Sequence, residues 1–176
     1  MPVDKRTYYT DAKLEAMRHN LANHDWAREA RDGILETADR WAAYDDDRLR
    51  GLAIPPQVPR AYQVNNFGCP VHGVEVHREG LYKWIIDFDD PFRVTCPVGG
   101  EVYPSNAFGQ FLDSGMQDRS LLTGAHADDG WGWHKSGVDE NYWFVAYYTH
   151  WSMMRFLPEA LTNLSEACLL TDDPDR

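Results

Sequence analysis

Two cysteine-containing turns with the same pattern are the residues best suited to chemistry. Residues 68–73 have the sequence GCPVHG, and residues 95–100 have the sequence TCPVGG. A Cys-x-x-Cys/His-Gly pattern is typical of a zinc knuckle, in which the glycine lets backbone N–H groups turn toward the sulfur. Cys69, His72 and Cys96 are therefore candidate ligands of a structural zinc ion.

The second turn lacks one ligand of this pattern. Position 99 is glycine where a fourth ligand would stand. Three protein ligands make a closed structural site only if another residue helps, and His77, Asp87 or Asp89 are candidates for that role. The alternative is a pair of tight turns with buried thiols and no metal.

A further set of candidates consists of aromatic side chains in the C-terminal half. Trp131 and Trp133 flank a glycine in a long loop, and rigid aromatic faces of this kind stack on sugar rings. Tyr147, His150 and Trp151 lie on a predicted apolar helix, and Tyr147 and His150 are candidates to line a cleft. The alternatives are that the two tryptophans fold back onto the core and that His150 is a satisfied core residue.

The composition limits the class of protein. The chain has 176 residues, of which 43% are hydrophobic, and this is enough for one domain with a buried core. Its formal charge of −11 argues against nucleic acid as a partner, because a polyanion would be repelled at long range. The acidic runs, Asp128-Asp129 among them, are expected to be solvated loops and helix N-termini. Three cysteines are too few for a disulfide scaffold, although Cys69 and Cys96 could in principle pair.

The sequence also bears on location. No apolar run approaches the ~20 residues of a membrane helix, so we expect no contact with a membrane. The N-terminal residues have no apolar segment behind them, so we expect no signal peptide. A cytoplasmic location fits, as does a periplasmic or secreted one if a leader has been removed.

The elements that would position these residues are mainly helical. After a loose arm over residues 1–9, Thr10 is expected to cap a helix from Asp11, and Asn23-His24 separates it from a second helix begun by Asp25. The apolar face of the second helix is expected to include Trp26 and Trp41. A short helical turn over residues 45–52 and a proline-stiffened surface linker over residues 53–59 follow.

Around the cysteines, the sequence predicts a small β-hairpin. Residues 81–86 and 92–95 have strand character and residues 87–91 form a turn, so one Cys-Pro-Val-x-Gly turn lies at each open end. A short strand is expected over residues 101–103.

The remainder is predicted to be helical around one long loop. Ser105 is expected to cap a helix that ends before Gly115, and residues 116–138 form the loop. Asp139 or Glu140 would open a helix that is apolar nearly all round and therefore buried. A second helix starting at Pro158 would complete an αα-hairpin. The sequence thus predicts a single domain with three parts, residues 1–60, 61–106 and 107–176.

Three segments resemble the N-terminal part of heparinase II/III-like proteins, which are bacterial polysaccharide lyases and their relatives. These segments are residues 68–73 (GCPVHG), 96–106 (CPVGGEVYPSN) and 141–148 (NYWFVAYY), and the helices around Trp26 and Trp41 also fit. The resemblance runs from about Tyr9 to the end of the chain, and residues 96–106 are its most specific part.

This resemblance implies a partial (α/α) toroid, that is, an incomplete ring of helical hairpins, here with the cysteine hairpin inserted. It also implies β-elimination on uronate-containing polysaccharides without a metal or organic cofactor. In that chemistry Asn and His side chains neutralise the carboxylate, a Tyr or His removes the acidified proton, and a Tyr protonates the leaving oxygen.

The chain also departs from the family. Its catalytic Asn/His motif has no match here, so the catalytic residues are unknown and the chain resembles a fragment. The resemblance implies an N-terminal helical module that is incomplete as a catalyst and contributes part of a sugar cleft through Trp131, Trp133, Tyr147, His150 and Trp151. Its expected partners are an acidic polysaccharide or oligosaccharide and a second copy of the chain. The alternative is a non-enzymatic domain, metal-stabilised or carbohydrate-binding. A local basic surface for the glycan would come from Arg78, Lys83, Arg93 and Lys135.

Overall fold

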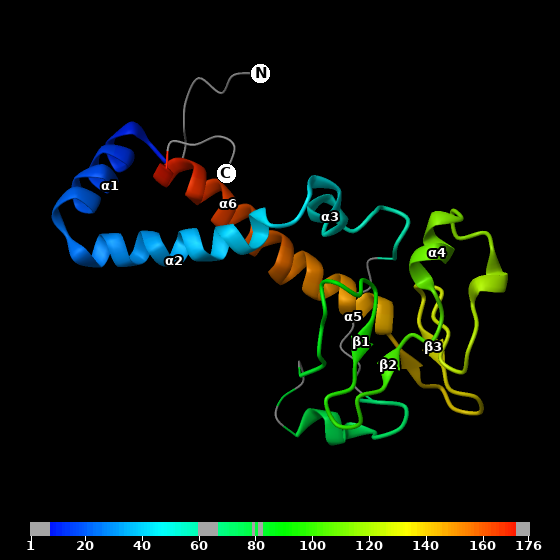
Figure 1. Cartoon of the computed structure of the whole chain (residues 1–176). Coiled ribbons are helices and arrows are strands. Elements are labelled where there is room, and N and C mark those ends of the chain that lie inside the picture. Colours follow the sequence, from blue (N-terminus) through cyan, green and yellow to red (C-terminus); the bar gives the residue numbers. More distant parts are fainter. Residues whose placement is uncertain (1–7, 60–66, 79, 81–82, 172–176) are drawn as a thin grey trace. The chain divides into compact units, whose positions relative to one another are not determined.

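The computed structural model describes residues 8–59, 67–78, 80 and 83–171 (Figure 1). The chain separates into two compact units. The helical unit comprises Met1–Leu49 and Glu159–Arg176, and the cysteine unit comprises Arg50–Pro158. The prediction of a single domain stays a prediction. The predicted N-terminal arm, apart from its last two residues, lies outside the described residues, as do Leu81 and Tyr82.

In the helical unit, the ends of the first two helices are as predicted. Helix α1 (Asp11–Asn23) begins after Thr10, whose hydroxyl accepts a hydrogen bond from the Lys13 N–H. Helix α2 (Asp25–Ala42) follows at once, and His24 is both the last cap of α1 and the first cap of α2. Asn23-His24 is therefore helix punctuation.

In the helical unit α1 packs against α2, and residues of both helices line one groove together with the C-terminal part of α6 (Leu157–Thr171). Tyr9 donates a hydrogen bond to Glu166 Oε1 (2.6 Å), which ties the segment before α1 to α6. Trp41 is buried, and Trp26, although 60% exposed, lines a groove of about 210 Å³ together with Ala27, Ala30 and Ile34 of the predicted apolar face. The buried residues of this unit are Leu14, Ala27, Ala38, Trp41, Ala160 and Ala167.

The cysteine unit begins at the end of the short helix α3 (Asp46–Gly51). The following segment was predicted to be a linker on the surface, and this is wrong. Ile54 and Val58 are buried in the main hydrophobic cluster, and the Val58 N–H donates to the Pro55 carbonyl to form a turn. The prolines keep the segment out of a helix, while its two branched aliphatic side chains anchor it to the core.

Two small antiparallel sheets form in this unit. Strand β1 (Val94–Thr95) pairs with β2 (Val102–Tyr103), and β3 (Trp133–His134) pairs with β4 (Asn141–Tyr142). The predicted hairpin is only partly present: Ile85 bridges Thr95, but the main partner of β1 is β2. The second Cys-Pro-Val turn is therefore itself the tip of a hairpin. Two short 3₁₀ turns, Val74–His77 and Arg119–Leu121, also belong to this unit.

Helix α4 (Phe108–Asp113) shows where a predicted cap is wrong. Ala107 precedes the helix and makes no side-chain cap. The Ser105 hydroxyl instead donates to the Thr123 carbonyl and accepts from the His126 N–H, which joins two distant loops. Gly115, with a φ of 70°, follows the helix as predicted.

The predicted αα-hairpin at the C-terminal end is also wrong. Helix α5 (Phe144–Trp151) runs through a π-helical turn, η3 (Ser152–Phe156), directly into α6 without a loop. Proline lacks an N–H and clashes with the carbonyl four residues earlier, but the wider π turn before Pro158 accommodates it within one continuous helical run. Asn141 and Tyr142, expected to be helical, form strand β4 instead.

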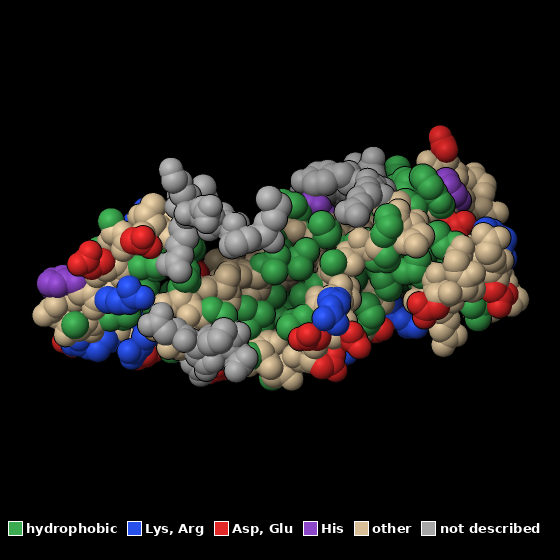
Figure 2. Space-filling model, turned by 90° about the horizontal axis from the view of Figure 1, so that it is seen from above, with side chains coloured by type: hydrophobic (Ala, Val, Ile, Leu, Met, Phe, Trp, Pro, Cys, Tyr) green, Lys and Arg blue, Asp and Glu red, His purple; other side chains and the backbone are tan. Residues whose placement is uncertain are grey.

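Helix α5 is buried as predicted and packs against β1. The described residues are mainly helical with two small sheets, which confirms the coarse fold class; the toroid stays a prediction. No described helix is both long enough and apolar enough to cross a bilayer. Figure 2 shows basic side chains scattered among acidic ones on one face of the molecule.

Candidate functional site

The first cysteine turn is closed by paired backbone hydrogen bonds. The Cys69 N–H donates to the Gly73 carbonyl (3.0 Å), and the Gly73 N–H donates back to the Cys69 carbonyl (2.8 Å). Gly68 has a φ of 76°, and a β-carbon there would lie 2.0 Å from the Gly73 oxygen. Only glycine fits at this position, because a side chain would force the turn open.

The second turn repeats this construction. The Cys96 N–H donates to the Glu101 carbonyl (2.8 Å), and the Gly100 N–H donates to the Cys96 carbonyl (2.9 Å). Gly100 has a φ of 78°, in the left-handed region that favours glycine. Each turn therefore presents its cysteine from a rigid, hydrogen-bonded backbone.

The fold brings the two cysteines together with one carboxylate. Sγ of Cys69, Sγ of Cys96 and a carboxylate oxygen of Glu101 all lie within 4.8 Å of one another. Both thiols are buried, and burial raises the pKa of Cys96. The Tyr103 hydroxyl lies 3.2 Å from Cys69 Sγ, and burial raises the pKa of this phenol as well.

His72 reaches the same cluster through Glu101. Its Nε2 lies 2.8 Å from Glu101 Oε1, and this hydrogen bond lowers the pKa of the Glu101 carboxyl. Glu101 Oε2 is buried and has no hydrogen-bond partner in the part of the chain that the structure describes. An unsatisfied buried carboxylate oxygen beside two thiols is a strong acceptor for a cation.

Gly99 explains why the second turn carries no ligand at that position. A β-carbon there would lie 2.1 Å from His72 Nε2 and 2.4 Å from both carboxylate oxygens of Glu101. The space of the missing fourth ligand is therefore filled by the His72–Glu101 pair.

Glu101 is a candidate ligand that the sequence analysis did not name. Within the described residues, the group that lies within ligand distance contains Glu101 and not His77, Asp87 or Asp89. Asp87 Oδ1 instead accepts the Asp89 N–H in a turn. The signal for Glu101 was its place directly after Gly-Gly at the end of the second turn. His72 as a direct ligand stays a prediction.

The two candidate tryptophans have different environments. Trp131 is 65% exposed, whereas Trp133 is half-buried, with its ring centroid 5.2 Å from that of Tyr142 and 4.7 Å from that of His126. Trp131 therefore keeps a face free for stacking, and Trp133 is mainly a packing residue.

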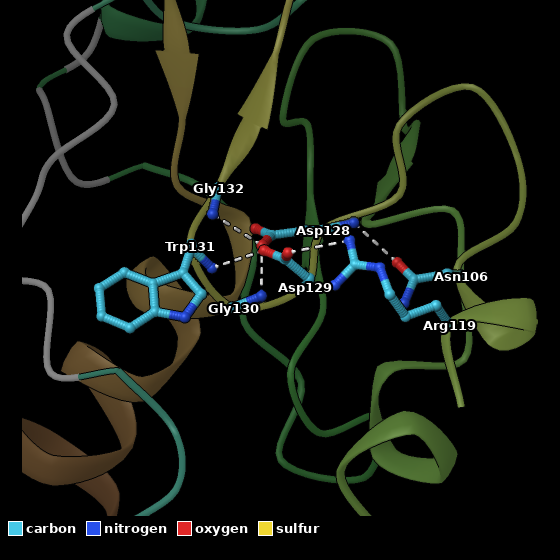
Figure 3. Close-up of polar contacts among 7 residues, drawn as sticks. All are labelled: Asn106, Arg119, Asp128, Asp129, Gly130, Trp131 and Gly132. Carbon is cyan, nitrogen blue, oxygen red and sulfur yellow. Dashed lines mark hydrogen bonds and ion pairs between the residues drawn. The ribbon is translucent and has the colours of Figure 1, made fainter. Parts of the chain in front are cut away.

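A buried carboxylate holds the loop that carries Trp131 (Figure 3). Asp128 Oδ1 accepts from the N–H groups of Gly130 and Gly132, and Oδ2 accepts from the Val145 N–H at the start of α5. Asp128 is fully buried, and this burial raises its pKa. Its expected role in a solvated loop is wrong, because three backbone donors replace water around it.

The other aromatic candidates lie together on α5. The Tyr147 ring centroid is 6.5 Å from that of Trp151, and His150 also contacts Trp151. Tyr147 is buried and cannot offer a face to a ligand, whereas Trp151 is partly exposed. The ring next to this group that sequence reasoning missed is Trp84, whose centroid lies 6.2 Å from that of Tyr147.

No protein-family model, curated protein or solved structure matches this chain. The resemblance to heparinase II/III-like proteins therefore stays a prediction.

Proposed function

We propose that the cysteine unit is a metal-stabilised domain in which Cys69 and Cys96 bind a structural zinc ion. The observation that carries this proposal is that the two buried Sγ atoms and a carboxylate oxygen of Glu101 lie within 4.8 Å of one another. The two cysteines come from turns with the same backbone hydrogen-bond pattern. Thiolate, imidazole and carboxylate are the ligands that zinc takes in proteins.

In this proposal Glu101 is the third ligand, because it supplies an oxygen that lacks a partner among the described residues. The His72 ring contacts the other carboxylate oxygen of Glu101, so His72 either holds Glu101 in position or becomes a ligand when the ion binds. Such outer hydrogen bonds orient metal ligands and raise their affinity.

The role of the ion is structural because its ligands belong to the core. Cys69 and Cys96 both lie in the main hydrophobic cluster of the unit, together with Trp84 and Tyr103. Metal binding at such a place contributes directly to the free energy of folding. Since burial raises the pKa of Cys96, binding must release protons and should weaken as the pH falls.

Metal analysis and thermal melting test this proposal. We expect about one zinc ion per chain after purification, and a large fall in melting temperature when a chelator removes it. Cys69→Ser and Cys96→Ser should lose the metal and the chelator response. Cys168→Ser is the matched control, because this thiol lies on α6, and it should retain both. Metal-free wild-type protein with a chelator-insensitive melting temperature would refute the proposal.

Substituting Glu101 and His72 shows whether each residue binds the metal ion or only positions a ligand. Cobalt(II) can replace zinc, and its visible absorption reports the ligand set. Glu101→Gln should change this spectrum if Glu101 is a ligand, and His72→Gln should change it if His72 is one. Loss of affinity without a spectral change identifies a supporting residue.

A second proposal, that the chain is a sugar-binding module of a polysaccharide lyase, is favoured by the exposed Trp131 indole. This ring stands on a loop fixed by Asp128, so little conformational entropy would be lost on stacking. Uronate oligosaccharides should quench tryptophan fluorescence in the wild type and less so in Trp131→Ala. No absorbance of unsaturated product should appear, and turnover would contradict the expectation of an incomplete catalyst.

A further inference from the structure

A pocket in the cysteine unit combines indole rings with a cation. Its volume is about 170 Å³, and it is lined by Trp84, Ile86, Trp151, Arg155 and Phe156. Trp84 and Ile86 lie just before the turn at residues 87–91. Trp151 is the last residue of α5, and Arg155 and Phe156 belong to the π-helical turn η3. Ligand pockets for drug-sized molecules are about 300–1,000 Å³. This pocket would therefore hold about one ring.

The cation that lines this pocket is the guanidinium of Arg155. Arg155 lies over the Trp151 ring, with its guanidinium carbon 5.8 Å from the ring centroid. No acidic side chain in the described ranges pairs with it. Arg93 and Arg119, by contrast, are paired with Asp90 and Asp129. An unpaired guanidinium that stacks on an indole offers its planar N–H groups to a carboxylate.

One wall of the pocket is the buried ring of Trp84. Trp84 is only 5% exposed, and its ring packs against Tyr103 and Tyr147. Its indole N–H is buried without an acceptor among the residues described here. A buried donor without a partner favours any ligand or small shift that supplies an oxygen.

The backbone of η3, which carries Arg155 and Phe156, departs from regular α-helical geometry. The Leu157 N–H donates to the Ser152 carbonyl, five residues earlier, so the helix is locally widened at the turn that contains Arg155 and Phe156. Widened turns of this kind occur frequently at functional sites. Ser152 itself is fully buried and donates to the Leu52 carbonyl (2.7 Å), which fixes the turn to the core.

From these features we infer that the pocket binds a small ring-shaped carboxylate. Arg155 pairs with the carboxylate, and the indoles of Trp84 and Trp151 contact the apolar face of the ring. The net charge of the chain is negative, so the attraction is short-ranged and depends on this one guanidinium. A uronic acid and an aromatic carboxylate share this chemistry. The inference does not depend on the metal site.

The experiment is a titration of ¹⁵N-labelled wild-type protein, in which the seven tryptophan indole N–H signals are followed separately. The probes are glucuronate, benzoate and the neutral methyl glucoside. We expect saturable shifts of the Trp84 and Trp151 signals with at least one of the two carboxylates, and no shift of the Trp131 signal. The signals are assigned with Trp84→Phe, Trp131→Phe and Trp151→Phe.

The charge requirement is tested by substitution. Arg155→Gln should weaken carboxylate binding by about 10-fold or more, and Arg155→Lys should restore part of it. Arg93→Gln is the matched control and should bind as the wild type does. A response to glucuronate alone identifies a sugar acid, and a response to benzoate alone identifies an aromatic acid. Equal binding of the neutral glucoside, absence of binding by both carboxylates, or unchanged binding by Arg155→Gln overturns the inference.

Discussion

Replacing Asp128 tests whether one buried carboxylate holds the Trp131 loop against the start of α5. The change Asp128→Ala removes the acceptor of three backbone N–H groups, those of Gly130 (2.7 Å), Gly132 (2.9 Å) and Val145 (3.3 Å). The bonds from Gly130 and Val145 are buried and the bond from Gly132 is partly buried, so at least two of the donors lose their partner where water does not replace it.

The size of the effect follows from two opposing contributions. A hydrogen bond to a charged group stabilises a protein by about 1.5–3 kcal/mol. Burial of the carboxylate, which raises its pKa, costs part of this gain. We therefore expect Asp128→Ala to lower the free energy of unfolding by about 3–5 kcal/mol. For a chain of this length that corresponds to a fall in melting temperature of about 6–20 °C.

The isosteric change Asp128→Asn is the matched control. It keeps the Oδ1 acceptor for Gly130 and Gly132, but it presents an amide donor to the Val145 N–H. We expect a loss of about 1–2 kcal/mol, smaller than that of the alanine variant. Urea unfolding followed by tryptophan fluorescence and circular dichroism measures both changes. A loss below about 1 kcal/mol for Asp128→Ala would show that the carboxylate does not hold the loop.

The pKa shift gives this prediction a pH dependence. Because burial raises the pKa of Asp128, the folded protein holds this proton more tightly than the unfolded chain. The stability that comes from this group is complete below the unfolded pKa of about 3.9 and is lost as the pH rises through the folded value. The advantage of the wild type over Asp128→Asn should therefore shrink from about pH 4 upward. An advantage that grows with pH would contradict the direction of the shift.

Two glycine substitutions give opposite predictions. Gly99→Ala places a methyl group against His72 Nε2 and the Glu101 carboxylate, so it should weaken zinc binding. It should lower the free energy of unfolding by only about 1 kcal/mol, because the ends of side chains and not the backbone must move. Unchanged zinc affinity would argue against a role for the His72–Glu101 pair. Gly33→Ala meets no atom within 4 Å on α2 and should raise the free energy of unfolding by about 0.5–1 kcal/mol, as measured by urea unfolding.

The features predicted correctly from the sequence are set by local interactions. The start of α1 depends on the Thr10 hydroxyl and a backbone N–H three residues later, and the end of α4 depends on the backbone freedom of Gly115. Both contacts lie within one turn of the chain, so residue type and spacing are sufficient to find them.

The features predicted wrongly depend on contacts between distant segments. Asn141 and Tyr142 have an apolar helical pattern around them, but pairing with β3 makes them a strand. At Pro158 the sequence predicts the first turn of a second helix, because a proline normally interrupts a helix. The preceding π turn, fixed by the bond between Ser152 and Leu52, removes that conflict. Neither partner can be recognised from the local pattern alone.

The metal cluster shows both kinds of information at one place. The two turns were found by their pattern, because each is closed by bonds between Cys69 and Gly73 or between Cys96 and Glu101. The pattern does not predict which residues make up the cluster, because this depends on which side chain from one turn reaches the other turn. A glycine at position 99 looked like a lost ligand, yet it is the residue that leaves room for His72 to meet Glu101. The glycine at position 99 therefore leaves the cluster intact, because the Glu101 carboxylate joins the two thiols and the His72 imidazole contacts that carboxylate.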